Sequence, residues 1–151
     1  MRQTPNAPFL RQPYGDSWKV YTYREAFEEA AAVATSMLER GLKKGDHVAI
    51  LSRNCCHWIL ADIAIMMAGM VSVPLYPTLP PDQIRDILGH ADVKALFAGK
   101  LEKWDSASLP QGVQLYKLPQ YAGCAVVDSG ISWDDLRFIV IFVHTTCSRT
   151  R

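Results

Sequence analysis

The sequence predicts an α/β fold in which a βαβαβ parallel layer follows an N-terminal β-hairpin. Three observations lead to this prediction. Short apolar, β-branched runs alternate with segments of helical periodicity, the connections are short, and the chain opens with two extended runs around a turn-rich segment. With 151 residues, of which 49% are apolar and 21% charged, the chain can bury the core of one ordinary domain.

The first elements are a hairpin and a long helix. Extended runs at 9–12 and 19–21 flank the turn-rich segment 14–18 and predict an antiparallel pair. Thr22 and Glu25 have the spacing of a capping box, which starts a helix that Gly41 ends as a left-handed cap. Apolar residues recur every three or four positions along it and predict its buried stripe: Ala26, Phe27, Ala30, Val33, Ala34, Met37 and Leu38.

The parallel layer comes next. Asn54 offers a cap for a helix that is apolar nearly all round, as a helix packed on more than one side must be. Pro74 is tolerated only at a sheet edge or strand end. Strand–helix–strand units with short connections pair in parallel with right-handed crossovers, so a doubly wound layer is expected. Its elements are a strand at 47–51, a helix at 55–69, a strand at 71–75, a helix at 81–90 and a strand at 94–98.

After Gly99 the pattern is weaker. Residues 104–110 read as a loop, and 132–135 as a short capped turn. Strands are expected at 113–118 and 124–128. The six apolar residues 138–143 predict a further strand, buried on both faces.

Charge and cysteine usage limit the partners and the compartment. The chain has 16 basic and 15 acidic side chains and a formal charge of +1, and no like-charge run is longer than a pair such as Lys43–Lys44. This charge distribution provides no basic patch that would bind nucleic acid or an anionic membrane surface. The four cysteines form no C-x-x-C pair, and residues 1–13 lack the pattern of a secretory signal. We therefore expect a cytoplasmic protein, either free or peripherally attached to a membrane.

Two local patterns are better explained by structure than by a special function. Residues 63–81 carry no Lys, Arg, Asp or Glu, but their four prolines argue against a transmembrane span. The adjacent Cys55, Cys56 and His57 rarely point at one ion, and no second ligand pair follows at zinc-finger spacing. We therefore assign no metal site.

Motifs for nucleotide binding or nucleophilic catalysis are missing. A Rossmann site needs glycines in the first strand-to-helix turn, and here that turn reads Ser52–Asn54. The aromatic residues of the predicted hairpin are better explained by packing of the hairpin than by a platform on which nucleic-acid bases stack. The four histidines lie in different predicted elements and do not have the spacing of a catalytic triad: His47, His57, His90 and His144. The clustered Met66, Met67 and Met70 are expected to fill the core.

The order of several short motifs resembles the start of the adenylate-forming acyl-CoA synthetases. Residues 21–25, 41–50 and 64–78 match this pattern, as do Asn54 and Trp58. The segments 11–18 and 74–79 favour the long-chain fatty acid branch. The resemblance covers residues 9–100 well and 101–143 loosely.

The resemblance implies an incomplete part of the large N-terminal domain of these enzymes. Residues 1–143 would be the N-terminal portion of the AMP-binding domain, and 144–151 an irregular tail from a truncated or frameshifted gene product. Such enzymes use ATP and magnesium to convert a carboxylate to an acyl-adenylate, then transfer the acyl group to coenzyme A. The implied partners are therefore a fatty acid and coenzyme A.

In the family, a phosphate loop rich in Thr, Ser and Gly follows the strand expected at 138–143. Here 144–151 follow it, and the last glycine is Gly130. A phosphate cradle needs closely spaced backbone N–H groups, which glycines permit. We therefore name no catalytic, cofactor-binding or metal-binding residue and expect this chain alone to be an inactive ligase fragment.

Two other expectations concern association and function. A sheet cut in this way leaves unpaired strands and apolar patches, so self-association or aggregation is expected. The alternative function is a non-catalytic binding or regulatory α/β module. An unrelated α/β domain is a third interpretation, since this layer hosts many activities.

Overall fold

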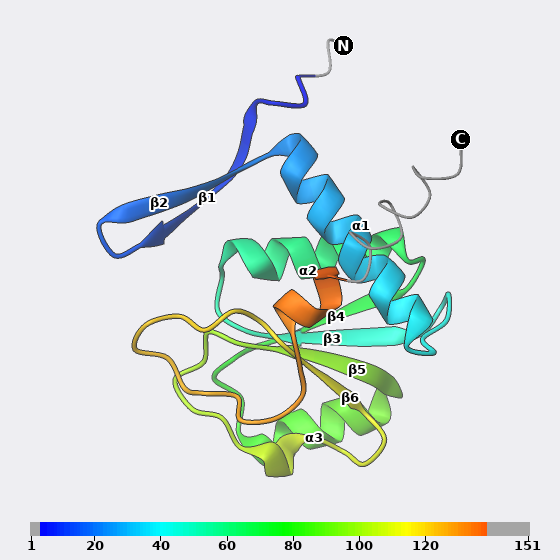
Figure 1. Cartoon of the computed structure of the whole chain (residues 1–151). Helices are drawn as coiled ribbons and strands as arrows, with labels where there is room; N and C mark the ends of the chain where they lie inside the picture. The colour runs from blue at the N-terminus through cyan, green and yellow to red at the C-terminus, as the bar shows by residue number, and fades with distance from the viewer. Residues whose placement is uncertain (1–3, 139–151) are drawn as a thin grey trace.

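The computed structural model describes residues 4–138, and it is the α/β fold that the sequence predicts. A two-stranded hairpin precedes a five-stranded parallel sheet of order β4-β3-β5-β6-β7 (Figure 1). The elements are β1 Pro8–Tyr14, β2 Ser17–Thr22, α1 Tyr23–Glu39, β3 His47–Leu51, α2 Cys56–Met67, β4 Val71–Leu75, α3 Pro81–His90, β5 Val93–Ala98, a 3₁₀ turn Ser106–Ser108, β6 Gln114–Lys117 and β7 Ile131–Ser132.

Helices cover both faces of the sheet, as in a doubly wound layer. Alternate residues of β3 separate two cores. Val48 and Ile50 pack with α1 and α2, whereas Ala49 and Leu51 pack with α3. Figure 1 shows α1 and α2 together on one side and α3 on the other. This arrangement confirms the parallel pairing expected from the short connections.

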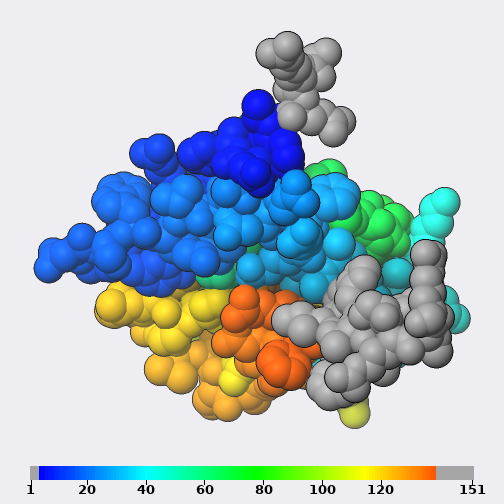
Figure 2. Space-filling model, turned by 45° about the horizontal axis from the view of Figure 1, so that its top comes forward, coloured from blue at the N-terminus to red at the C-terminus, as the bar shows by residue number. Residues whose placement is uncertain are grey.

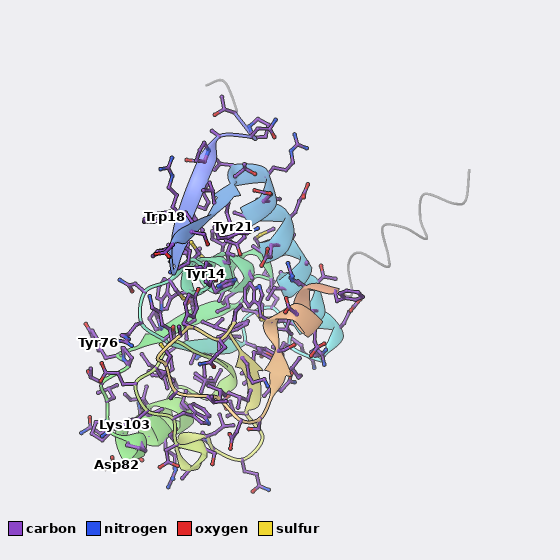
Figure 3. The ribbon with its side chains drawn as sticks, turned by 60° about the vertical axis from the view of Figure 1, so that its left-hand side comes forward. Tyr14, Trp18, Tyr21, Tyr76, Asp82 and Lys103 are labelled. Atoms are coloured by element: carbon purple, nitrogen blue, oxygen red, sulfur yellow. The ribbon has the colours of Figure 1, made fainter. Side chains whose placement is uncertain are left out.

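The hairpin is confirmed, but it packs only partly on the body. Gly15 has a φ of +58° in the tight turn between β1 and β2, a conformation that glycine adopts without strain. Tyr21 is buried, whereas Trp18 is 65% exposed. Figure 3 shows Tyr14, Trp18 and Tyr21 together at the hairpin. Hairpin packing therefore explains Tyr21 but not Trp18.

Helix α1 begins with the expected capping box. The Glu25 N–H donates to Thr22 Oγ1 at 3.2 Å, and the Thr22 N–H donates to Glu25 Oε2 at 2.8 Å. Gly41 follows the helix with a φ of +93°. The predicted stripe was wrong at Phe27 and Leu38, which are exposed because they lie beside the sector that faces α2 and the sheet.

Three further expectations were wrong or lie outside the described residues. Asn54 does not cap α2; Cys55 is the N-cap residue, and its side chain makes no capping bond. Residues 124–128 form an irregular loop rather than a strand, because the Ala125 N–H donates to Leu101 O at 2.8 Å instead of joining a ladder. The strand expected at 138–143 lies outside the described residues except for Phe138, which is in a helical turn.

Strand β4 is an edge of the described sheet, as Pro74 predicts. The Val71 N–H donates toward β3, to Asp46 O at 2.9 Å. Because N–H groups alternate in direction along a strand, the missing donor of Pro74 falls on the outer edge, where it costs no ladder bond. No helix among residues 4–138 is long and apolar enough to cross a membrane.

Candidate functional site

The carboxyl ends of the parallel strands form the candidate site. The chain passes from β3 to β4 on one side of β3 and then returns to β5 on the other. The chain leaves β3 toward α2 on one face of the sheet, whereas the segment after β5 packs on the opposite face beside α3, through Trp104 and Leu109, so the loops after β3 and β5 diverge. Open α/β sheets bind ligands at such a topological switch point.

Two cationic side chains join these loops. The Arg53 Nε donates to Lys100 O at 3.3 Å, and the Lys100 Nζ donates to Asn54 O at 2.9 Å. Arg53 also forms an ion pair with Glu102 at 3.3 Å, where the two side chains are 45% and 79% exposed. An exposed ion pair of this kind contributes little to stability. An incoming anion can therefore replace Glu102 as the partner of Arg53 at little cost in free energy.

An open crevice of about 1110 Å³ lies beside this junction. Its floor comes from the strand ends and one wall comes from the hairpin. Figure 2 shows the hairpin lying along the segment that follows β6. The crevice is lined by Gln12, Pro13, Tyr14, Gly15, Ser52, Arg53, Asn54, Pro77, Lys100, Gln120, Tyr121, Ala122 and Cys124.

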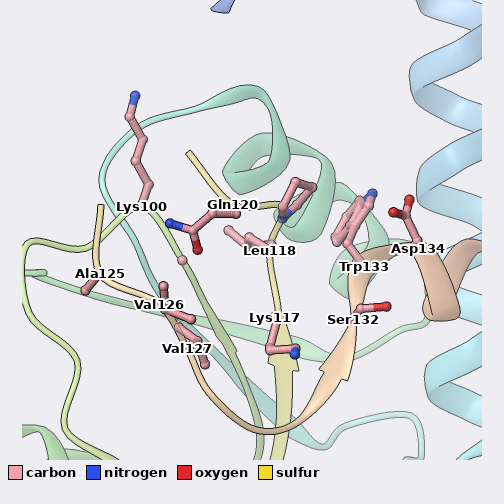
Figure 4. A pocket seen from close by; sticks show the side chains of 12 residues that line it. Lys100, Lys117, Leu118, Gln120, Ala125, Val126, Val127, Ser132, Trp133 and Asp134 are labelled. Carbon is pink, nitrogen blue, oxygen red and sulfur yellow. The ribbon is translucent and has the colours of Figure 1, made fainter. Parts of the chain in front are cut away.

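A smaller pocket of about 340 Å³ lies at the ends of β5, β6 and β7. It shares Lys100 and Gln120 with the open crevice and adds Lys117 and Trp133. Figure 4 shows the Lys100 ammonium pointing away from the pocket centre, toward the loop before α2. Lys100 therefore belongs to the junction, and the smaller pocket is mainly a gap between loops.

A buried network of tyrosine and histidine joins the crevice to the hairpin. Tyr21 Oη lies 3.2 Å from His57 Nε2, and Tyr121 Oη lies 2.7 Å from His57 Nδ1. The Trp133 ring packs edge-on against His57, with ring centroids 5.4 Å apart. A neutral imidazole has one donor and one acceptor nitrogen, so one tyrosine accepts a hydrogen bond and the other donates one.

Burial keeps this network uncharged. It lowers the pKa of His57 to about 4, and the nearby Arg137 acts in the same direction. Burial also raises the pKa of Tyr21 and of Tyr121. Both nitrogens of the buried His57 ring are occupied by tyrosine hydroxyls, so this histidine does not reach an external substrate as a general base.

Gln12 connects the hairpin directly to the start of α2. Its Oε1 accepts a hydrogen bond from the Cys56 N–H at 2.9 Å, and both groups are buried. This bond replaces the side-chain cap that Cys55 does not provide. Tyr14 adds a second contact at the same place, stacking on Tyr121 with ring centroids 5.6 Å apart.

The sequence patterns found only part of this arrangement. Of the four histidines, His47 donates from Nδ1 to Ala91 O at 2.6 Å, and His90 is exposed. His144 lies outside the described residues. Within residues 4–138 no group of three His, Cys, Asp or Glu side chains could hold a metal ion. Arg53 and Lys100 were not predicted, although each follows the end of a predicted parallel strand, which is the signal that could have identified them.

Comparisons with known proteins agree with this architecture. The family model described as "AMP-binding enzyme" matches residues 1–134. The probable CoA ligase CCL6 of Humulus lupulus is 34% identical over 102 residues, which cover 64% of this chain and 16% of that protein. The peroxisomal long chain acyl-CoA synthetase 7 of Arabidopsis thaliana is 38% identical over 81 residues, which cover 54% of this chain and 11% of that protein.

A solved structure supports the fold independently. The Brucella canis acyl-CoA synthetase superposes with a TM-score of 0.71 at 16% identity, over 88% of this chain and 24% of that one. At this identity the likeness concerns the fold alone. This chain spans only 16% and 11% of the length of the two curated relatives, so it corresponds to a small part of each.

Proposed function

Because the chain belongs to the AMP-binding enzyme family, we propose that it is the N-terminal portion of an ATP-dependent long-chain fatty acid–CoA ligase. Relatives named as a CoA ligase and a long chain acyl-CoA synthetase support this proposal. In the proposed reaction a fatty acid carboxylate and ATP give an acyl-adenylate and pyrophosphate. The thiol of coenzyme A then takes the acyl group, and AMP leaves.

The crevice at the ends of β3 and β5 is the observation that supports a substrate role for this portion. ATP and coenzyme A both carry several phosphate charges, and Arg53 and Lys100 place two cations at the ligand-binding edge of the sheet. We expect the crevice to form one wall of the substrate site in a full-length enzyme. Residues 1–143 would supply this scaffold, and 144–151 would add an irregular tail.

The chain alone is proposed to be inactive. The sequence has no glycine-rich phosphate loop, and the buried His57 ring has both nitrogens occupied by tyrosine hydroxyls. The magnesium ion that the resemblance implies has no ligand cluster among residues 4–138. A cytoplasmic location stays a prediction, since one relative is named as peroxisomal.

ATP–pyrophosphate exchange tests the proposed inactivity. The purified chain should give no exchange above the blank with fatty acids of increasing length, because it lacks the backbone cradle that would hold the phosphates. A full-length long chain acyl-CoA synthetase, assayed beside it, should give robust exchange. Fatty-acid-dependent exchange by the purified chain would contradict this part of the proposal.

A second candidate function is a non-catalytic binding module. It is favoured by the uncovered apolar surface of α2, where Ile59, Met66 and Met67 are exposed. An apolar-all-round helix normally packs on more than one side, so this surface suits a protein partner. Expressing the chain beside a full-length relative and isolating a stable complex would favour the module over the inactive fragment.

A further inference from the structure

Besides its contacts with α1, the hairpin contacts the body through three side chains near the start of α2. Gln12 bonds to the Cys56 N–H, Tyr14 stacks on Tyr121, and Tyr21 bonds to His57. Beyond them the hairpin projects from the body (Figure 1). The same hairpin residues, Gln12 to Gly15, form one wall of the open crevice. The position of the hairpin therefore sets the width of the crevice.

We propose that the Tyr21–His57–Tyr121 network holds the hairpin against the body only while the His57 ring is neutral, so that mild acid releases the hairpin and widens the crevice. The network joins three elements: β2, the first turn of α2, and the loop after β6. This inference does not depend on the proposed ligase function, because it concerns only contacts among described residues.

Three features of the site oppose a charge on His57. The side chain is 4% exposed, so protonation would bury a cation without solvent. His57 is the second residue of α2, where the positive end of the helix dipole repels a cation. Both of its nitrogens already face tyrosine hydroxyls, so no carboxylate is in hydrogen-bond contact to compensate the charge.

Charged groups near His57 act on its pKa in both directions. Asp134 raises the pKa of His57, whereas Arg137 and Lys19 lower it, and burial dominates. Glu29 is engaged elsewhere, since it accepts a hydrogen bond from Trp133 Nε1 at 2.6 Å. Among residues 4–138, the charged and titratable groups around the network are Tyr14, Lys19 and Tyr21 of the hairpin, Glu29 of α1, Cys55 and Cys56 at the start of α2, Tyr121 after β6 with Lys100 over its ring, and Asp134 and Arg137 after β7.

The direction of the pH effect follows from linkage. The pKa of His57 is about 4 in the packed hairpin and returns toward 6.5 when the ring reaches water. The released form therefore binds the extra proton, and release becomes more favourable as pH falls from about 6.5 to about 4. Between pH 7.5 and 5 the equilibrium constant for release should rise about 30-fold.

Amide hydrogen exchange at Cys56 measures this release directly. Its N–H is protected by Gln12, so it exchanges when the hairpin leaves. Exchange followed by NMR at pH 7.5 and pH 5, corrected for the intrinsic pH dependence of exchange, should show this increase of about 30-fold. The amides of β5 should keep their protection, which separates hairpin release from global unfolding.

Two matched variants identify the titrating group. His57→Gln keeps one donor and one acceptor but cannot be protonated, so the increase at Cys56 should disappear. His90→Gln changes an exposed histidine outside the network and should leave the increase intact. Should His57→Gln fold poorly, Tyr121→Phe keeps the ring and removes one bond to His57, and should raise exchange at both pH values.

Three results would overturn the proposal. The first is corrected exchange at Cys56 that does not change between pH 7.5 and 5. The second is an unchanged increase in folded His57→Gln. The third is equal loss of protection at Cys56 and in β5, which would mean that acid unfolds the whole chain.

Discussion

At the scale of single residues, Gln12 is expected to contribute to stability although it lies in a hairpin that packs only partly on the body. It lies 44 residues from Cys56 and supplies the cap that the start of α2 lacks. Gln12→Met keeps the length of the side chain but leaves a buried N–H without an acceptor. We expect the free energy of unfolding to fall by about 1–2 kcal/mol.

Urea denaturation followed by circular dichroism measures this loss. Gln83→Met is the matched control, because Gln83 is exposed on α3, and it should change stability by less than about 0.5 kcal/mol. Equal stability of the two variants would show that the Gln12 bond contributes nothing.

Two glycines give opposite predictions for the same substitution. A Cβ on Gly99 would lie 2.6 Å from Leu118 Cβ, whereas a Cβ on Gly89 meets nothing within 4 Å. Gly99→Ala should therefore destabilise the chain by about 1–3 kcal/mol through overpacking. Gly89→Ala, in helix α3, should stabilise it by about 0.4–1 kcal/mol. Thermal unfolding of both variants checks the signs, and a Gly99→Ala variant as stable as the parent would contradict the close packing there.

The sequence could not predict which side chains meet at the crevice. Tyr21 and Tyr121 lie 36 and 64 residues from His57, and no local pattern encodes such contacts. The sequence favours an ordinary histidine at position 57, and its two tyrosine partners come from the hairpin and from the loop after β6. Arg53 and Lys100 could have been predicted, since the carboxyl ends of parallel strands meet at one sheet edge.

At the scale of elements, local signals determined the first helix. The capping box at Thr22 was readable from the sequence, and the structure confirms both of its hydrogen bonds. Thr22→Ala removes the acceptor of the Glu25 N–H and should cost about 1 kcal/mol of stability.

The matched control for this helix is Thr35→Ala. Thr35 is exposed in the interior of α1, where its hydroxyl donates to Ala31 O at 2.9 Å. Alanine has the higher helix propensity there, so this variant should be at least as stable as the parent. Chemical denaturation of both variants tests the cap, and a Thr22→Ala variant no weaker than Thr35→Ala would contradict it.

Element boundaries were predictable where the hydrophobic period was strong. Strands β3 and β4 and helix α3 have the predicted bounds, because each is a short run ended by Gly, Pro or a polar turn. Residues 124–128 have a strand-like composition, yet Val126 is 67% exposed and the segment has no ladder partner. Composition indicates β-propensity, but a strand also needs a free neighbouring edge.

At the scale of the whole molecule, one side of the described structure is apolar and open. Met66 on α2 is 57% exposed and Val71 on the β4 edge is 46% exposed. Burying such a surface is favourable, so we expect the chain to associate at micromolar concentration or above. Size-exclusion chromatography with light scattering should give a mass above 16.9 kDa that rises with concentration.

Substitutions on this surface test where association occurs. Met66→Lys and Val71→Lys should each weaken association about tenfold, because each would desolvate a charge in the contact. Val126→Lys changes a residue of similar exposure in the loop after β6, at the other end of the sheet, and should have no effect. A parent chain that stays at 16.9 kDa at every concentration would contradict the prediction.

The central claim is that these residues form the N-terminal scaffold of a fatty acid–CoA ligase. The most direct test replaces the aligned segment of the Arabidopsis long chain acyl-CoA synthetase 7 with the corresponding residues of this chain and measures acyl-CoA formation from a long-chain fatty acid. We predict that the folded chimera forms acyl-CoA, and that Arg53→Gln together with Lys100→Gln in the chimera raises the KM for ATP or coenzyme A. A folded chimera that forms no acyl-CoA would contradict the claim.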